Sequence, residues 1–187
     1  MNALQIYIDR DEKSDIIKTT EIKGIVKVIN NFENGKYEEY YQIDNVKNGF
    51  YQKFYQDNKP LRQCFYVNGL LNGLFRQYND NGQIDFECYY LNDKMHGQFC
   101  QYYVFNQLTN YGLLYRKCNF VNGVLNGVYT SYYDNEQIEE VCQYVDGKIE
   151  GVCKRYHENG KIASLCNYVN GEINGVVERY DEFGNCI

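Results

Sequence analysis

Hydrophobic and polar residues alternate along this chain in short runs that are separated by glycine-containing turns. No run between two turns exceeds about ten residues, and the runs are rich in Tyr, Phe, Val and Ile, which favour strands over helices. Two extended runs joined by an Asn-Gly or Asp-Gly turn indicate a β-hairpin. Turns of this kind lie at Asn68-Gly69, Asn81-Gly82, Asp146-Gly147 and Asn159-Gly160. The pattern predicts hairpins joined end to end in an antiparallel meander.

The hairpin recurs at a fixed step. Its lead glycines are Gly49, Gly73, Gly97, Gly127, Gly151 and Gly175, at steps of 24, 24, 30, 24 and 24 residues, and Gly24 heads a degenerate first unit. The long step places an insertion near residues 104–113. We therefore expect an all-β fold, an elongated antiparallel β-meander or solenoid of tandem hairpins in a single twisted sheet, over residues 24–187. Residues 1–23 break the repeat and are interpreted as an N-terminal cap against edge pairing.

Two columns of the repeat are chemically uniform. An aromatic residue stands five positions after each lead glycine, and we call this column the aromatic ladder: Phe54, Tyr78, Tyr102, Tyr132, Tyr156 and Tyr180. A cysteine stands fifteen positions after each lead glycine from Gly49 to Gly151, allowing for the insertion: Cys64, Cys88, Cys118, Cys142 and Cys166. A second aromatic residue, such as Tyr66 or Tyr90, follows each cysteine by two positions, so it shares the face of the cysteine.

The unit GLFRQYNDNGQI at residues 73–84, followed by YLNDKMHG at residues 90–97, resembles the MORN repeat family. The step length and the Tyr-x-x-Asn-Gly-x-Ile core are similar to the variant found in bacterial proteins described as antitoxins and in large DNA viruses of amoebae. The resemblance covers residues 24–187. It implies an elongated β-meander with an aromatic groove, used for protein association and, in some members, for contact with phosphoinositides. The cysteine column and the insertion depart from the family pattern.

Composition and charge narrow the function classes. Tyr (21) and Phe (10) supply much of the apolar material, and the formal charge is −6 with both signs interspersed. Nucleic acid and anionic membranes prefer clustered basic residues, so we expect no nucleic-acid partner and disfavour membrane binding. The N-terminal residues lack a secretory leader and no long apolar run is present, so we expect an intracellular or virion-associated protein without a transmembrane segment and with reduced thiols.

The cysteine column invites a metal or redox interpretation, which strand geometry disfavours. Equivalent positions in adjacent units are two strands apart, about 9.6 Å, beyond the roughly 7 Å Cα separation that a disulfide tolerates. We interpret these thiols as small core residues between rings. Outside the column, Cys153 with Cys166 and Cys100 with Cys118 are candidate cross-strand neighbours, which the sequence leaves open.

Catalytic chemistry finds no support in the sequence. We interpret His96 and His157 as solvated turn residues. The paired carboxylates Glu38-Glu39 and Glu139-Glu140 are adjacent along the chain, so we expect each pair to point to opposite faces of a strand. We expect no enzyme activity, no cofactor, no metal and no small-molecule substrate.

The aromatic ladder is the predicted partner-binding surface, because a single-layer sheet leaves one face uncovered. Phe105, Asn106 and Tyr111 in the insertion are candidates for a specificity loop. The favoured hypothesis is a non-catalytic scaffold that associates with a protein partner or with itself. The alternatives are an antitoxin-like module that binds one cognate protein, and a phosphoinositide-binding surface protein.

Overall fold

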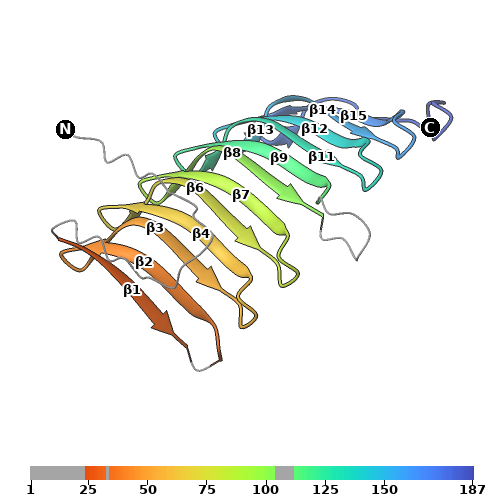
Figure 1. Cartoon of the computed structure of the whole chain (residues 1–187). Coiled ribbons are helices and arrows are strands. Elements are labelled where there is room, and N and C mark those ends of the chain that lie inside the picture. Colours follow the sequence, from red (N-terminus) through yellow and green to blue (C-terminus); the bar gives the residue numbers. More distant parts are fainter. Residues whose placement is uncertain (1–23, 33, 104–111) are drawn as a thin grey trace.

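The computed structural model describes residues 24–32, 34–103 and 112–187, and these ranges contain strands but no helix. They form one antiparallel sheet of 17 strands, in which each long strand pairs with the next along the chain (Figure 1). The predicted fold class, a single-sheet meander of tandem hairpins, is confirmed. The predicted cap at residues 1–23 and the loop candidates Phe105, Asn106 and Tyr111 lie outside the described residues.

The strands follow one another along an elongated, twisted ribbon, and they bend in the same direction (Figure 1). In chain order they are β1 (Ile25–Asn31), β2 (Tyr37–Ile43), β3 (Val46–Phe54), β4 (Pro60–Val67), β5 (Leu70–Leu71), β6 (Gly73–Tyr78), β7 (Ile84–Leu91), β8 (Lys94–Tyr102), β9 (Leu114–Val121), β10 (Val124–Leu125), β11 (Gly127–Tyr132), β12 (Ile138–Val145), β13 (Lys148–Ile149), β14 (Gly151–Tyr156), β15 (Ile162–Val169), β16 (Glu172–Ile173) and β17 (Glu178–Arg179).

Two-residue turns close each unit. At Asn68-Gly69 both residues have positive φ, 50° and 83°, and Asn122-Gly123 repeats this with 51° and 85°. This is the type I′ geometry, which matches the twist of paired strands and favours Asn-Gly. The turn residues therefore fix the register of the strands on either side.

The lead glycines bend the strands. Gly73 (φ 82°) and Gly127 (φ 105°) occupy a backbone region that other residues rarely adopt. The two-residue strand β5 ends two residues before Gly73, and the intervening Asn72 donates its amide N–H to the carbonyl of Phe65 at 2.9 Å. Strands β5 and β6 are therefore one strand with a kink at the lead glycine.

The mid-unit turns are the second fixed point, and the insertion replaces one of them. Asn79 N–H donates to the Gln83 carbonyl at 2.9 Å across a normal turn, and Tyr103 N–H donates to the Leu113 carbonyl at 2.8 Å in the unit with the long step. The insertion thus begins and ends at the same closing hydrogen bond as the tight turns, so the strands on both sides keep the register of the array.

Candidate functional site

The sheet has two faces with different chemistry. Tyr51 pairs with Cys64, Phe75 with Cys88 and Phe99 with Cys118, and side chains alternate along each strand. We call the face that carries these residues the cysteine face, and the opposite one the ladder face. The buried cluster of Tyr51, Cys64, Phe75 and Cys88 lies on the cysteine face, with rings such as Phe86 and Tyr90 packed against it.

The aromatic ladder lies on the ladder face, opposite the cysteines, and all six of its residues are half-buried. Phe54 stacks on Tyr37 with ring centroids 4.5 Å apart. The Tyr78 hydroxyl donates to Gln63 at 2.6 Å, and the Tyr102 hydroxyl donates to Glu87 at 3.1 Å. Burial raises the pKa of Tyr102 to about 12, and the Glu87 carboxylate acts in the same direction. The hydroxyls of Tyr78 and Tyr102 therefore bond to the preceding unit, whereas that of Tyr180 bonds to Glu178 of its own unit. The proposed role of the ladder in binding a partner stays a prediction.

Ring packing occurs mainly on the cysteine face, both within and between units. Phe86 stacks on Phe75 of its own unit and on Phe99 of the next, with centroid distances of 5.8 and 5.7 Å. Phe99 packs edge-on against Phe120 of its own unit at 6.1 Å. No two ladder rings are in ring contact, although all six ladder residues are among those described. Ring contacts are thus made mainly by columns other than the ladder.

Sequence reasoning missed a column that joins neighbouring units. One residue after each ladder position, Tyr103 and Tyr133 donate their hydroxyl protons to the backbone carbonyls of Tyr132 and Tyr156 in the next unit, at 2.6 and 2.7 Å. His157 occupies the same column and its Nε2 donates to the Tyr180 carbonyl at 2.9 Å. His157 is therefore an inter-unit contact and not a solvated turn residue. The recurrence of Tyr at this position was the available signal.

An exposed aromatic row crosses the N-terminal part of the ladder face. Phe50 pairs with Phe65, and Leu74 pairs with Tyr89. The register of β4 with β6 places Phe65 beside Leu74, so the four side chains form one line across four strands, which we call the outer row. Phe65 is 37% exposed and Tyr89 48% exposed. Phe50, Phe65 and Leu74 also line a shallow hollow of about 320 Å³.

Polar groups beside the outer row are already hydrogen-bonded. Gln63 Nε2 donates to Gln52 at 3.0 Å, and Gln52 Nε2 donates to Glu39 at 3.3 Å. Arg76 Nε lies 3.0 Å from a Glu87 carboxylate oxygen. Because these groups have partners within the sheet, covering the row with another molecule leaves few of them unsatisfied.

The same line of positions changes chemistry further along the sheet. Gln98 pairs with Asn119, Val128 with Gln143 and Val152 with Asn167, so amides alternate with valines. Aromatic rings, which dominate the energetics of binding surfaces, are absent from these positions. The outer row is thus confined to the N-terminal half of the ladder face.

Three thiols of the cysteine column, those of Cys64, Cys88 and Cys118, are buried and protonated at neutral pH. Burial raises the pKa of Cys64, Cys88 and Cys118 to about 11 in each case. A protonated thiol is a poor nucleophile and a poor metal ligand. These three residues fit the predicted role of small core residues between aromatic rings.

The expectation that the cysteines are reduced is wrong at one place. Cys142 on β12 and Cys153 on β14 form a disulfide, with Cα atoms 4.4 Å apart. The predicted separation of two strands holds between column members, but Cys153 is outside the column and lies on the strand next to Cys142. Cys153 is also directly paired with Cys166, as one candidate pairing proposed. The other candidate is wrong, because Cys118 pairs with Phe99 and Cys100 pairs with Lys117, so the two cysteines face opposite sides.

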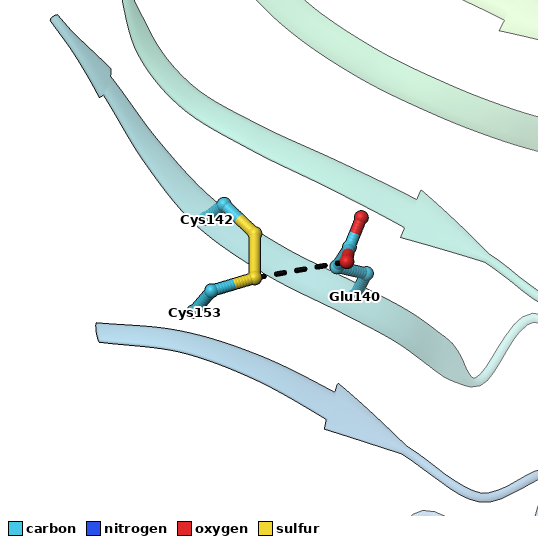
Figure 2. A group of neighbouring side chains, drawn as sticks. All are labelled: Glu140, Cys142 and Cys153. Atoms are coloured by element: carbon cyan, nitrogen blue, oxygen red, sulfur yellow. Dashed lines mark hydrogen bonds between the residues drawn. A yellow bond between two sulfur atoms is a disulfide. The ribbon is translucent and has the colours of Figure 1, made fainter. Parts of the chain in front are cut away.

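Glu140 completes a compact group with the disulfide (Figure 2). Its carboxylate and the two sulfur atoms lie within 4.8 Å of one another, which is close enough for shared metal ligation. In the disulfide, however, neither sulfur offers a thiolate, and Arg155 Nε lies 2.7 Å from Glu140 Oε1. The oxidised arrangement suits sulfur redox chemistry better than cation binding.

The two carboxylate pairs behave differently. Glu38 accepts from the Tyr51 hydroxyl and Glu39 accepts from Gln52, so this pair points to opposite faces as expected. Glu139 and Glu140 instead line one polar hollow of about 440 Å³, which contradicts the expected divergence. The cause is a register shift at Ser131/Tyr132, where β12 carries one extra residue and alternation is interrupted.

Comparison with known families gives one match. A family model described as MORN repeat variant matches residues 71–92, 125–146 and 149–170. No curated protein matches the chain. Among the described residues there is no helix that is long and apolar enough to cross a membrane. Each matched segment spans the two long strands of one hairpin and reaches into its closing turn, and the other units share their strand register. The chain therefore contains MORN repeats of the variant type at these three places.

Proposed function

We propose that this protein is a non-catalytic scaffold that binds a protein partner, either another protein or a second copy, through the ladder face. The observation that carries the proposal is the outer row of Phe50, Phe65, Leu74 and Tyr89, which is apolar, continuous across four strands and exposed at Phe65 and Tyr89. Contiguous apolar patches on a soluble protein mark interaction sites, and aromatic anchors supply much of the binding energy.

The rigidity of the surface supports this function. The outer row stands on strands whose register is fixed at both ends by turns, and the polar chain from Glu39 to Gln63 beside it is internally hydrogen-bonded. A preorganised surface loses little conformational entropy on binding. The ladder residues Phe54 and Tyr78 lie on the same face, four residues further along their strands, and would extend the contact surface.

The charge distribution favours a protein partner over a lipid surface. Lys47, the cation nearest the aromatic cluster, lies on the cysteine face, 4.5 Å from the Tyr40 ring centroid. Beside the outer row, Lys27 and Arg76 are ion-paired with Glu39 and Glu87, so this surface offers an anionic headgroup balanced charge and not a basic cluster. An antitoxin-like module that masks one cognate protein would use the same surface, so it is a narrower form of this proposal.

The test compares two matched double variants of the full chain. Replacing Phe65 and Tyr89 with Ser removes the exposed rings of the outer row, whereas replacing Val128 and Val152 with Ser changes exposed positions of the same line in the other half. Sedimentation velocity measures self-association, and quantitative affinity capture from cell extract measures binding to other proteins. We expect the first variant to lose at least about tenfold in association and the second to bind as wild type. Equal association by both variants would refute the outer row as the binding site.

A further inference from the structure

One line of side chains runs along the whole cysteine face and alternates ring and thiol. Neighbouring members are register partners on adjacent strands. In order along the sheet they are Tyr51, Cys64, Phe75, Cys88, Phe99, Cys118, Tyr129, Cys142, Cys153 and Cys166. A ring therefore separates the thiols of successive units at three places, and keeps them about two strand spacings, roughly 9.6 Å, apart.

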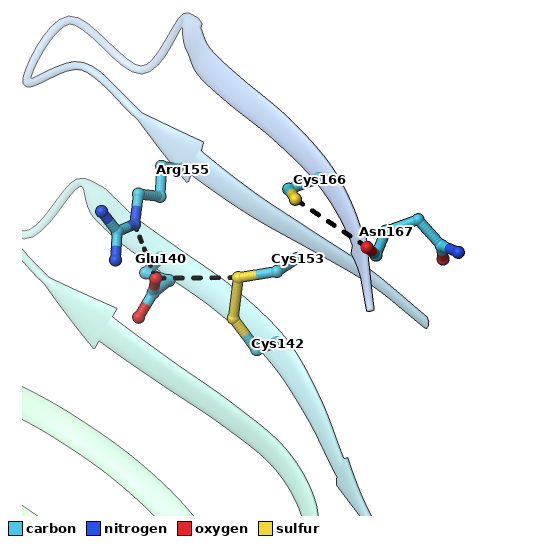
Figure 3. Close-up of a disulfide and its surroundings, with 6 residues drawn as sticks. All are labelled: Glu140, Cys142, Cys153, Arg155, Cys166 and Asn167. Carbon is cyan, nitrogen blue, oxygen red and sulfur yellow. Dashed lines mark hydrogen bonds and ion pairs between the residues drawn. A yellow bond between two sulfur atoms is a disulfide. The ribbon is translucent and has the colours of Figure 1, made fainter. Parts of the chain in front are cut away.

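The alternation breaks at Cys153. This residue stands two positions after the lead glycine Gly151, where the earlier units have Tyr51, Phe75, Phe99 and Tyr129. The replacement of a ring by a third sulfur brings Cys142, Cys153 and Cys166 onto three adjacent strands of one face (Figure 3). Among the described residues, this is where cysteines are direct register neighbours.

Cys153 has a possible disulfide partner on each side. Its bond to Cys142 joins β12 to β14, and its register partner on β15 is the free, buried thiol of Cys166. Directly opposed residues on antiparallel strands have Cα atoms about 4.5–5.5 Å apart, which is within the range that a disulfide accepts. A Glu140 carboxylate oxygen lies 3.6 Å from Cys153 Sγ, where it would accept a proton from the reduced thiol.

We propose that Cys142, Cys153 and Cys166 form a redox modification site in which Cys153 is shared by two alternative disulfides. The reduced pair Cys142 and Cys153 is oxidised by a low-molecular-weight disulfide, which leaves as two thiols while the protein disulfide forms. The Cys166 thiolate then attacks Cys153 Sγ, the Cys142–Cys153 bond breaks, and Cys142 leaves as a thiolate that takes up the proton lost by Cys166. This second step involves no net oxidation.

A polar hollow provides the approach to this site. Glu140 and Arg155 line it together with Ser164, and the Arg155 side chain is 67% exposed. Glu140 and Arg155 are two residues from Cys142 and Cys153 along their strands, so the hollow opens beside the disulfide on the cysteine face (Figure 3).

The two disulfides differ in what they connect. Cys142–Cys153 links two successive repeat units, whereas Cys153–Cys166 lies within the single hairpin of β14 and β15. The first restrains the junction between units and the second does not, so exchange would change how firmly the last units are held to the array.

The experiment maps disulfides in the full chain. Reduced protein is equilibrated with glutathione disulfide, free thiols are blocked with N-ethylmaleimide at low pH, and linked peptides are quantified by mass spectrometry. Wild type should give the Cys142–Cys153 peptide with a minor Cys153–Cys166 peptide. Cys142→Ser should raise the latter by about tenfold or more, and Cys166→Ser should retain only the former. Cys88→Ser, at a thiol flanked by rings, should leave the pattern of wild type.

Disulfide exchange itself is measured as a time course of alkylation. In oxidised wild type, Cys142 should become alkylated slowly while Cys153 stays protected, and Cys166→Ser should abolish that alkylation. If Cys142→Ser leaves Cys153 and Cys166 both fully alkylated, the shared site is refuted. Circular dichroism verifies the fold of each variant, and Cys142→Ala replaces Cys142→Ser if the hydroxyl prevents folding.

Phe75→Cys supplies the converse test, because a disulfide between position 75 and Cys64 or Cys88 should then appear. Its absence from folded protein would contradict the role assigned to the rings.

Discussion

The two halves of the array share one backbone plan but differ on both faces. In the N-terminal half, rings such as Phe75 separate the buried cysteines, and the outer row of Phe50, Phe65, Leu74 and Tyr89 is aromatic. In the C-terminal half, Cys153 replaces a ring, and amides alternate with valines in place of the outer row. The difference shows that turn residues and lead glycines maintain the architecture, while each half of the sheet is free to carry its own chemistry.

The largest loss of stability should follow from removing a ring that separates the cysteines of the N-terminal half. Phe75 is buried and contacts Phe86 and Tyr90, with centroid distances of 5.8 and 5.5 Å. Replacing Phe75 with Ala should lower the free energy of unfolding by about 3 kcal/mol, whereas Cys153→Ala should lower it by about 1 kcal/mol under reducing conditions, since a smaller side chain is lost. Urea unfolding with excess reductant measures both. Equal losses would mean that the rings are not the main packing elements of their half.

The next effect concerns the column that joins units through side chains. Tyr133 donates to the Tyr156 carbonyl in the C-terminal half, whereas Asn79 occupies the equivalent position in the N-terminal half with a buried amide nitrogen that lacks a partner. Tyr133→Phe should lower stability by about 1 kcal/mol, and Asn79→Tyr should raise it by a similar amount.

Thermal and urea unfolding of these two variants provide the measurement. Tyr89→Phe, which removes a hydroxyl from an exposed ring, is the control and should change stability by less than about 0.5 kcal/mol. If Asn79→Tyr destabilises the protein, the inter-unit hydrogen bond that Tyr55 and Tyr133 make in the two halves is not transferable to position 79.

The smallest change in stability is expected from substitutions in two mid-unit turns. Glu136 (φ 65°) and Asn58 (φ 63°) both adopt the left-handed region, where Gly82 and Gly160 stand in other units. Because Asn tolerates this conformation better than Glu, Glu136→Gly should stabilise the fold by roughly 0.5–1 kcal/mol and Asn58→Gly by less. Chemical denaturation resolves this if both variants are compared in one series. A larger gain from Asn58→Gly would show that the turn of the C-terminal half is not the strained one.

Prediction from sequence succeeded where the repeat constrains the backbone. Asn68-Gly69 and its equivalents marked the hairpin turns, and Gly73 and its equivalents marked the repeat step, because their positive-φ conformations select particular residues. Prediction failed where the strand register decides which side chains become neighbours. The extra residue in β12 brought Glu139 and Glu140 to one hollow, and the pairing of β8 with β9 separated Cys100 from Cys118.

The candidate site was located only in part. The ladder was recognised from its spacing, but the outer row has no uniform column: Phe50 and Leu74 share one repeat position with Gln98, Val128 and Val152. A search for uniform columns therefore passes over it. Its continuity depends on the alignment of Phe65 with Leu74 between units, which is a property of strand pairing.

The sequence by itself determined the repeat length, the hairpin turns, the strand direction and the face shared by cysteine and aromatic columns, since all of these follow from local conformational preference and side-chain alternation. The tertiary structure alone decided which residues of different units become neighbours. It placed Cys153 between Cys142 and Cys166 and assembled the outer row across four strands. The physical reason is that contacts between units depend on register and bulges, and a shift of one residue reverses the face on which a side chain lies.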